Sequence, residues 1–245
     1  MKKILIFGSS GFFGKNFLNS LNINEYDVLT ISRFKSESTN FNSLTYEEIS
    51  RNEKLLDGKF FDEVFDFSSN VSVDDFISRP QNMFLQNLEI PIYNINLLNK
   101  YSFSGRYNYI STDRAIHEIS EDSMDKVILR NDPYGASKLI SELFIKYNMS
   151  LVGGETSIIR FPNLYGPLQT SKQFIPSIIS QIIETPNKEI EVGSLDGSRN
   201  FMFVSDAVSA LNNYLKSKVK FDVVCFSGKN EKLIDIVECI SKIYK

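Results

Sequence analysis

Tyr134 and Lys138 stand four residues apart in the run Tyr134-Gly135-Ala136-Ser137-Lys138. In a helix, two residues with this spacing lie on the same face. A phenol, whose pKa is about 10, is a poor base at neutral pH, but a nearby ammonium stabilises the phenolate and lowers that pKa. The pair therefore predicts proton transfer by Tyr134, to or from a hydroxyl or carbonyl oxygen, with assistance from Lys138.

The residues before the pair predict the elements that position it. Proline fits the first turn of a helix, so Asp132-Pro133 marks a helix start. Upstream, residues 107–110 form a short apolar run, typical of a buried strand, that leads to Thr112. We expect Thr112 to donate a hydrogen bond to the same oxygen, to or from which Tyr134 transfers a proton. A Tyr-x-x-x-Lys pair alone is more often an exposed helix pair, and the strand before it favours the functional interpretation.

Three glycines, Gly8, Gly11 and Gly14, follow the first apolar run of the chain and precede a segment with helical periodicity. Such glycines permit a tight turn, close approach of a pyrophosphate to the backbone, and close packing of helix on strand. The N-terminus of this helix would supply free N–H groups and partial positive charge to phosphates. An ordinary strand-to-helix turn is the alternative, but the position after the first strand favours dinucleotide binding.

Strand-like and helix-like segments alternate along the whole chain, without repeats or low-complexity tracts. This alternation predicts an α/β protein with a doubly wound parallel sheet of the Rossmann type. Right-handed crossovers would bring the strand ends at Gly8, Ser32, Ser68 and Thr112 to one edge, where such sheets bind ligands. We expect a helix over residues 83–98 despite its proline. In the helix after Pro133 we expect one apolar face, formed by Ala136, Leu139, Ile140, Leu143, Phe144 and Tyr147.

Composition and charge exclude several classes of protein. Hydrophobic residues make up 42% and charged residues 23%, which is typical of a globular protein. The net charge is -3 and no long basic run occurs, so nucleic acid is not an expected partner. Without a signal peptide or a long apolar stretch, we expect a cytoplasmic protein that does not bind membranes. The two cysteines are far apart and the only histidine, His117, has no cluster to join, so no metal site is expected.

The second apolar run ends at Ile31-Ser32-Arg33. At this position an acidic residue would hold the ribose 2′-hydroxyl of NAD. A hydroxyl and a guanidinium instead suit a 2′-phosphate. We therefore expect NADP(H) to be preferred, with NAD(H) as the alternative. Arg33 could also be a solvated surface charge, or stack on the adenine.

The G-x-x-G-x-x-G loop, the Tyr-x-x-x-Lys pair and the threonine between them resemble those of the extended short-chain dehydrogenases/reductases, the NAD-dependent epimerase/dehydratase family that modifies nucleotide sugars. The resemblance covers nearly the whole chain. It implies catalytic roles for Thr112, Tyr134 and Lys138. It implies cofactor binding by Gly8, Gly11, Phe12, Phe13, Gly14, Ser32, Arg33, Ser68, Ser69, Asn87, Tyr134 and Lys138.

Two later segments also resemble the family. Residues 160–167 are similar to its R-x-x-N-x-Y-G-P segment, and residues 197–207 to its R-D-F-x-Y-V-x-D-x-A segment. The resemblance implies that Asn163 contacts the substrate and that Arg199 binds the nucleotide diphosphate. For Arg199 the alternative is a structural ion pair with Asp206 or Asp196.

The family resemblance also implies a division into two parts. We expect residues 1–165 to form the dinucleotide-binding domain, to which residues 204–226 return. Residues 166–203 and 227–245 would then form a small substrate-binding lobe. Family members commonly continue beyond the segment similar to residues 225–245, so we expect this lobe to be truncated.

Two departures from the family bear on the reaction. Ser68-Ser69 replaces two alanines that many members place against the cofactor. After Thr112, dehydratases carry an acid followed by Glu or Lys, whereas this chain has Asp113-Arg114. Asp113 could contact the substrate and protonate a leaving hydroxyl. An arginine stays charged and cannot deprotonate the neighbouring carbon, which argues against 4,6-dehydration.

We therefore expect an NADP(H)-dependent oxidoreductase that acts on a nucleotide-activated sugar, most simply a 4-ketoreductase with Tyr134 as proton donor. An epimerase is the alternative, and a 4,6-dehydratase follows it. A non-catalytic NADP-binding scaffold belongs to a different class, and such proteins usually lose the tyrosine or the lysine. The family often dimerises through two helices, for which Phe84, Leu88, Ile140 and Phe144 are apolar enough, although core packing explains these residues equally well.

Overall fold

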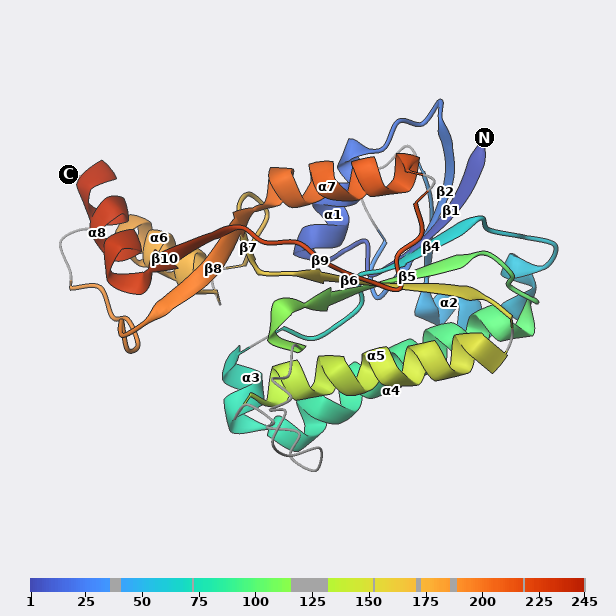
Figure 1. The fold of residues 1–245 in the computed structure, drawn as a ribbon, viewed down its shortest axis with the longest axis horizontal. Helices are drawn as coiled ribbons and strands as arrows, with labels where there is room; N and C mark the ends of the chain where they lie inside the picture. Colours follow the sequence, from blue (N-terminus) through green and yellow to red (C-terminus); the bar gives the residue numbers. More distant parts are fainter. Residues whose placement is uncertain are drawn as a thin grey trace.

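The computed structural model describes residues 1–35, 41–71, 73–115, 132–151, 153–170, 173–185, 189–217 and 219–244. Its main feature is a seven-stranded sheet in the order β3-β2-β1-β4-β5-β6-β9, with every neighbouring pair parallel (Figure 1). The strands are β1 (Lys2–Phe7), β2 (Tyr26–Ser32), β3 (Asn42–Thr45), β4 (Glu63–Asp66), β5 (Arg106–Thr112), β6 (Glu155–Phe161) and β9 (Val223–Cys225).

Helices cover both faces of this sheet. On one face lie α1 (Phe12–Ser20) and α7 (Val204–Lys216), and on the other lie α4 (Pro80–Lys100) and α5 (Pro133–Leu151) (Figure 1). The short elements α2 (Tyr46–Arg51), η1 (Glu53–Leu56), α3 (Val73–Ser78) and η2 (Asp113–Ala115) complete this part. Because both faces are covered, the strands are apolar at successive positions: Ile4 and Ile6 enter one core, Leu5 and Phe7 the other. The predicted doubly wound α/β fold is confirmed.

A smaller sheet forms a lobe beyond the carboxyl ends of the large-sheet strands (Figure 1). Its order is β10-β8-β7, from β7 (Asn163–Tyr165), β8 (Ser198–Phe203) and β10 (Lys229–Lys232), and the helices α6 (Phe174–Glu184) and α8 (Leu233–Ile243) accompany it. Between β8 and β10 the chain returns to the large sheet through α7 and β9. The strand β7 pairs with β8, although it lies just ahead of the boundary after residue 165 that the sequence predicts.

The proline in α4 is accommodated by a contact from the neighbouring helix. Pro91 has no N–H, so the carbonyl of Asn87, four residues earlier, lacks its helical donor. The hydroxyl of Ser141 on α5 lies 3.0 Å from that carbonyl oxygen and 2.9 Å from the carbonyl oxygen of Ser137. Since Ser141 and Asn87 are both buried, no bulk water can replace the hydroxyl. The contact lets α4 continue through its proline while it packs on α5.

We expect Ser141→Ala to lower the free energy of unfolding by about 1–3 kcal/mol, the usual cost of a buried acceptor left without a donor. Chemical denaturation of the wild type and the variant measures this difference. Ser150→Ala is the matched control, because the Ser150 hydroxyl also bonds a carbonyl of α5, that of Tyr147, but is exposed. If both variants lose the same small amount of unfolding free energy, the hydrogen bond from Ser141 to the Asn87 carbonyl does not stabilise the protein.

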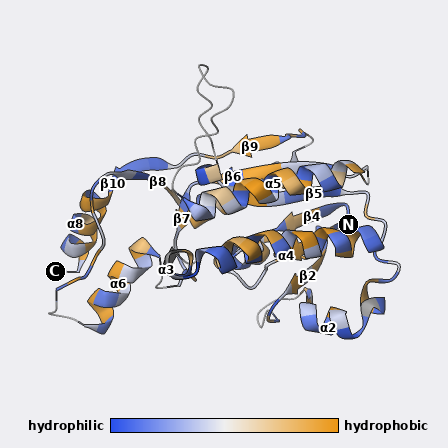
Figure 2. Ribbon diagram, turned by 90° about the horizontal axis from the view of Figure 1, so that it is seen from below, coloured by the Kyte–Doolittle hydropathy of each residue, from blue (hydrophilic) through white to orange (hydrophobic). Residues whose placement is uncertain are grey.

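The buried face of α5 is mainly polar, which differs from the expected apolar face. Ser137, Lys138, Ser141 and Glu142 are buried, together with Ile145 and Met149. By contrast, Ile140, Leu143 and Tyr147 are 39%, 59% and 66% exposed. Each buried polar side chain has hydrogen-bond partners, which removes most of the cost of its burial. Because polar residues occupy most of the buried face of α5, Ile140, Leu143 and Tyr147 lie on its outer side. The helices α4 and α5 lie side by side in Figure 2.

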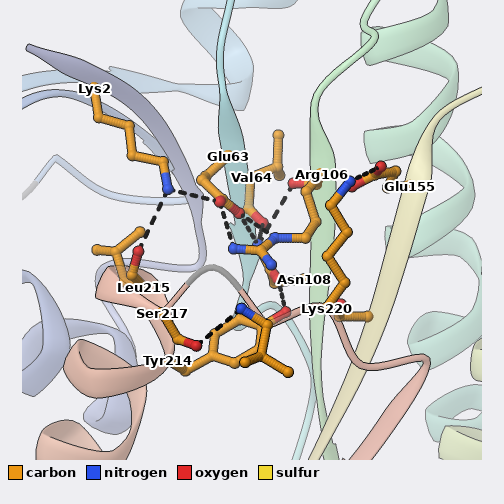
Figure 3. Close-up of polar contacts among 12 residues, drawn as sticks. Lys2, Glu63, Val64, Arg106, Asn108, Glu155, Tyr214, Leu215, Ser217 and Lys220 are labelled. Carbon is orange, nitrogen blue, oxygen red and sulfur yellow. Dashed lines mark hydrogen bonds and ion pairs between the residues drawn. The ribbon is translucent and has the colours of Figure 1, made fainter.

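A polar cluster holds the amino ends of β1, β4 and β5 together, at the edge of the sheet away from Thr112 (Figure 3). Glu63 accepts hydrogen bonds from Arg106 at 2.6 and 2.9 Å, from Lys2 at 2.8 Å and from Asn108 at 2.8 Å. Tyr214 of α7 donates to Asn108 at 2.9 Å, and the Arg106 guanidinium lies 4.8 Å from the centroid of its ring. This cluster is structural, since it joins three strands and a helix.

Among the described ranges, no helix combines the length and the apolar character that crossing a membrane requires. Within the same ranges, no three acidic, histidine or cysteine side chains come together as a metal site would need. His117 lies outside the described residues.

Candidate active site

The glycine loop connects β1 to α1, and its shape requires glycine at two positions. Gly8 has a φ of +74°, and a Cβ there would lie 2.7 Å from the backbone nitrogen of Ser68. At Gly14 a Cβ would lie 2.4 Å from the carbonyl oxygen of Gly8. Gly11 is exposed, and a Cβ there would meet only the Gly8 carbonyl oxygen, at 3.4 Å. Gly8 and Gly14 therefore serve the packing of the loop against α1 and against the segment after β4, whereas Gly11 is exposed.

The N-terminus of α1 is open to an anion. Gly11 is the N-cap residue, no side chain caps the helix, and its first turn contains no acidic residue. Phe13 is held by edge-to-face contacts with Phe67 and Phe161, at centroid distances of 5.2 and 5.0 Å. In the same loop the Ser9 hydroxyl is buried and has no hydrogen-bond partner among the residues that the structure describes. Free N–H groups at a helix N-terminus bind phosphate, so these residues fit a dinucleotide pyrophosphate.

The end of β2 carries the two residues expected to select the cofactor. Ser32 is buried, and its hydroxyl donates to the carbonyl oxygen of Phe34 at 2.6 Å. Its proton is therefore committed within the protein. Arg33 is exposed at the strand end, whereas the nearby Lys35 forms an ion pair with Glu48 at 2.6 Å. Of the predicted pair, Arg33 is thus the residue that is exposed at the surface, whereas Ser32 is buried.

Tyr134 lies half-buried at the start of α5, among groups from three other segments. The ring of Phe76 packs edge-on against it at 5.6 Å between centroids, and the Arg114 guanidinium lies 5.3 Å from its centroid. Burial raises the pKa of Tyr134 to about 12. Arg114 and a hydrogen bond with the Ser69 side chain oppose that rise, while the carboxylates of Asp132 and Asp113 add to it. Tyr134 is therefore a neutral phenol at neutral pH.

The expected lowering of the Tyr134 pKa by Lys138 is wrong for this structure. The Lys138 ammonium donates to the carbonyl oxygen of Ile110 at 2.8 Å and lies 4.0 Å above the ring of Tyr109. Burial lowers the pKa of Lys138 to about 8, against the opposing effect of Asp66 and Glu142. The lysine thus faces the end of β5, and the cation near the phenol is Arg114. The i, i+4 spacing fixes a shared helix face but not where two long side chains end.

Thr112 and the two residues after it form a rigid turn against the start of α5. The Thr112 hydroxyl donates to Asp113 at 3.3 Å and accepts from the backbone N–H of Arg114 at 3.2 Å. The Arg114 side chain binds Asp132 through two hydrogen bonds of 2.5 and 2.6 Å. Asp132 also accepts from the N–H of Gly135 at 3.2 Å, in the first turn of α5. The turn therefore positions Tyr134 relative to Thr112.

Asn87 and Ser68 are occupied by contacts within the protein. The Asn87 amide donates to the carbonyl of Asn70 and to the Ser137 hydroxyl, both at 3.1 Å, and accepts from the N–H of Asn70 at 2.6 Å. Asn87 thus ties the loop after β4 to α5. Ser68 bonds to Asp66 through its backbone N–H, at 2.8 Å, and through its hydroxyl. Both residues position the segment that brings Ser69 to Tyr134.

Of the three predicted substrate residues, Asn163 and Arg199 lie in the small lobe, whereas Asp113 lies in η2 after β5. The Asn163 amide donates to the carbonyl of Asn200 at 2.9 Å, which joins β7 to β8. Arg199 is exposed on β8. Among the hydrogen bonds and ion pairs of the described residues, none joins Asn163 or Arg199 to Tyr134, and none joins Arg199 to Asp206 or Asp196.

Asp66 is a buried group at this edge that the sequence analysis missed. It is 0% exposed at the end of β4 and accepts hydrogen bonds from Tyr107, Asn94 and Ser68. A signal was present, because Asp66 stands in the run Val64-Phe65-Asp66-Phe67, whose other residues are apolar.

The fold and the site together define a dinucleotide-binding α/β protein with a tyrosine and a lysine at the carboxyl edge of its sheet. The NAD dependent epimerase/dehydratase family matches this chain over residues 4–224. The chain therefore belongs to the NAD dependent epimerase/dehydratase family.

Comparison with individual proteins agrees with this membership. The dTDP-glucose 4,6-dehydratase of Escherichia coli is 25% identical over 280 residues, which cover 98% of this chain and 76% of that protein. The GDP-6-deoxy-D-mannose reductase of Pseudomonas aeruginosa is 28% identical over 160 residues, which cover 61% of this chain and 52% of that protein. The crystal structure of UDP-glucose 4-epimerase from Thermotoga maritima with UDP-glucose has a TM-score of 0.79 at 20% identity, covering 99% of this chain and 82% of that one.

Proposed function

We propose that the protein is an NADP(H)-dependent reductase of a nucleotide-activated keto sugar, with Tyr134 as the proton donor. The observation that carries this proposal is the arrangement of Arg114, Asp132 and Tyr134. Arg114 is held against Tyr134 by its two hydrogen bonds to Asp132. An arginine cannot remove a proton from carbon. Arg114, two positions after Thr112, therefore supports reduction and not the carbon deprotonation that dehydration needs.

Each residue of the site has a role in this proposal. The bound nicotinamide supplies the hydride. Tyr134, a neutral phenol, gives its proton to the oxygen of the reduced carbonyl. Ser69 and Thr112 orient the groups around that oxygen, Arg114 is the cation beside the phenol, and the Lys138 ammonium supplies positive charge at the end of β5. The open N-terminus of α1 holds the pyrophosphate.

The substrate class follows from the relatives. The named dehydratase, reductase and epimerase all carry a nucleotide sugar in their names, and we propose one for this chain. Asn163 would hydrogen-bond the sugar, and Arg199 the diphosphate. Purified protein should consume NADPH with at least one of the UDP-, GDP-, CDP- or dTDP-4-keto-6-deoxy sugars. Binding of NADPH without turnover of any of them would favour a non-catalytic scaffold.

An epimerase is the second candidate, supported by the similarity to the Thermotoga maritima UDP-glucose 4-epimerase. An epimerase returns its hydride to the same sugar and needs no net supply of cofactor. Incubation with UDP-glucose and a catalytic amount of NAD⁺, without NADPH, and analysis for UDP-galactose distinguishes the two. We expect no interconversion.

We expect Arg33→Ala to weaken NADPH binding about tenfold or more, because a charge-assisted hydrogen bond contributes about 1.5–3 kcal/mol. NADH lacks the 2′-phosphate, so its affinity should change little. Fluorescence titration with both cofactors measures the ratio. Arg51→Ala is the control, since Arg51 is an exposed arginine that pairs with Glu47 on α2. Equal losses of affinity for NADPH and for NADH would show that Arg33 does not bind the 2′-phosphate.

We also propose a homodimer through α4 and α5. Leu85 is 51% exposed on α4, and Leu143 and Tyr147 are 59% and 66% exposed on α5. Exposed apolar side chains on neighbouring helices mark an association surface. Sedimentation analysis should give twice the mass of the chain, a dimer, for the wild type. It should give the mass of one chain, a monomer, for Leu143→Asp. A wild type that sediments as a monomer at micromolar concentration contradicts this proposal.

A further inference from the structure

We infer that Asp66 is the counter-charge of Lys138, a positioning residue that keeps this buried lysine charged beneath the active site. The inference rests on the proposed function for its meaning in catalysis, but the interaction itself is independent of any reaction. It joins the end of β4 to α5.

The geometry places both charges on one face of the sheet. Asp66 is the register partner of Tyr109 in the parallel pair β4–β5, so their side chains point to the same side. The ammonium of Lys138 lies 4.0 Å above the ring of Tyr109. Asp66 is 0% and Lys138 1% exposed. Both charged groups thus lie in the same buried layer between the sheet and α5.

The partners of each group are neutral. The Asp66 carboxylate accepts from the Tyr107 hydroxyl, from the Asn94 amide at 2.9 Å, and from the N–H and hydroxyl of Ser68. Lys138 donates to a backbone carbonyl, that of Ile110. Within the part of the chain that the structure describes, neither group takes part in a direct ion pair. Burial of an uncompensated charge is costly, and these two charges have opposite signs.

Glu142 is the other carboxylate that acts on Lys138, but its charge is already compensated. Arg160 binds Glu142 through hydrogen bonds of 2.5 and 3.0 Å, and Ser111 donates to it at 2.5 Å. An ion pair with a guanidinium cancels most of the field of the carboxylate at a third group. Asp66 therefore remains the main source of negative charge for the lysine.

The remaining groups around Lys138 do not replace Asp66. Tyr109 faces it from β5, and burial raises the pKa of Tyr109 far above neutrality, so its ring carries no charge. Tyr134 is also neutral at neutral pH, and its neighbours Asp132 and Arg114 pair with each other. Burial brings the pKa of Lys138 down to about 8, and Asp66 is the first opposing charge. Without Asp66, the lysine should lose its proton near neutral pH.

The test is an NMR titration of protein with ¹³C-labelled lysine side chains, without substrate or cofactor. Lys138→Arg identifies the Lys138 resonance by its loss. In the wild type this resonance should titrate near pH 8, and in Asp66→Asn its midpoint should fall by about one unit or more. Glu142→Gln and Tyr107→Phe are the controls, and each should move the midpoint less than Asp66→Asn does. An unchanged midpoint in folded Asp66→Asn overturns the inference.

If Asp66→Asn does not fold, stability decides the question. Lys138→Met should then be destabilised, and the double variant Asp66→Asn/Lys138→Met should recover part of the loss, because the two charges disappear together. A double variant that also fails to fold would overturn the inference. The wild-type turnover assay tests the proposed function separately, so failure of one is distinguishable from failure of the other.

Discussion

Tyr134→Phe should reduce the kcat of keto-sugar reduction by a factor of about 10² to 10⁴, the usual contribution of a positioned acid. The phenylalanine keeps the ring contacts with Phe76 and Arg114 but has no proton to donate. Affinity for NADPH should stay near that of the wild type, because the glycine loop and α1 are unchanged. Steady-state kinetics and a fluorescence titration measure the two quantities on the same preparation.

Tyr147→Phe is the matched control for this substitution. Tyr147 is on the same helix, but it is 66% exposed and faces away from the sheet. Its replacement should leave kcat within about twofold. If Tyr134→Phe retains wild-type turnover, the proton donor is a different group, and the catalytic assignment is wrong.

Glu63→Gln should lower the free energy of unfolding by about 3–5 kcal/mol at neutral pH, as expected when one partner of a buried ion pair is removed. Glu63 and Arg106 are both buried, and the guanidinium would lose its two hydrogen bonds to a carboxylate (Figure 3). The exposed pair Glu155–Lys220 offers a control, because Glu155→Gln should change stability by less than about 1 kcal/mol. Equal effects of the two substitutions would contradict the structural role of the cluster.

The effect of Glu63 should also depend on pH. Burial alone raises the pKa of Glu63, but the hydrogen bonds from Arg106, Lys2 and Asn108 outweigh it, so that the pKa is lowered. A carboxyl group with a lowered pKa in the folded state stabilises the protein fully above its unfolded pKa, about 4.3. That contribution is lost as the pH falls through the folded pKa. Denaturation at pH 7 and near pH 3 should show the wild type approaching Glu63→Gln at acid pH.

The large sheet and the glycine loop could be predicted because their signals are local. A run such as residues 4–7 is apolar throughout, since each of its faces enters a covered core, and Gly8, Gly11 and Gly14 follow it directly. The strands of the lobe have three to six residues and pair between distant segments, as β8 does with β10. Short strands of this kind carry little periodicity, so the sequence does not indicate them.

The sequence predicts candidate site residues, but it does not predict the contacts between them. Asn87 binds Ser137, fifty positions away, and such a pairing exists only after α4 and α5 have packed. The sign of the Tyr134 pKa shift failed for the same reason, because the fold places Arg114, Asp132 and Asp113 around the phenol and turns Lys138 toward β5. The polar side of α5 was missed because the apolar residues, and not the hydrogen-bonded ones, carry the helical periodicity.

Transfer of deuterium from NADPH to a sugar tests the central claim most directly. The protein is incubated with NADPH deuterated at the transferred position and with the nucleotide 4-keto-6-deoxy sugar that it turns over fastest, and the product is analysed by mass spectrometry and NMR. The account predicts one deuterium on the carbon that carried the keto group. With Tyr134→Phe, almost no deuterated product should form in the same time. Product formed without deuterium, or sugar interconverted with hydrogen from its own ring, would contradict it and assign the protein to the epimerases.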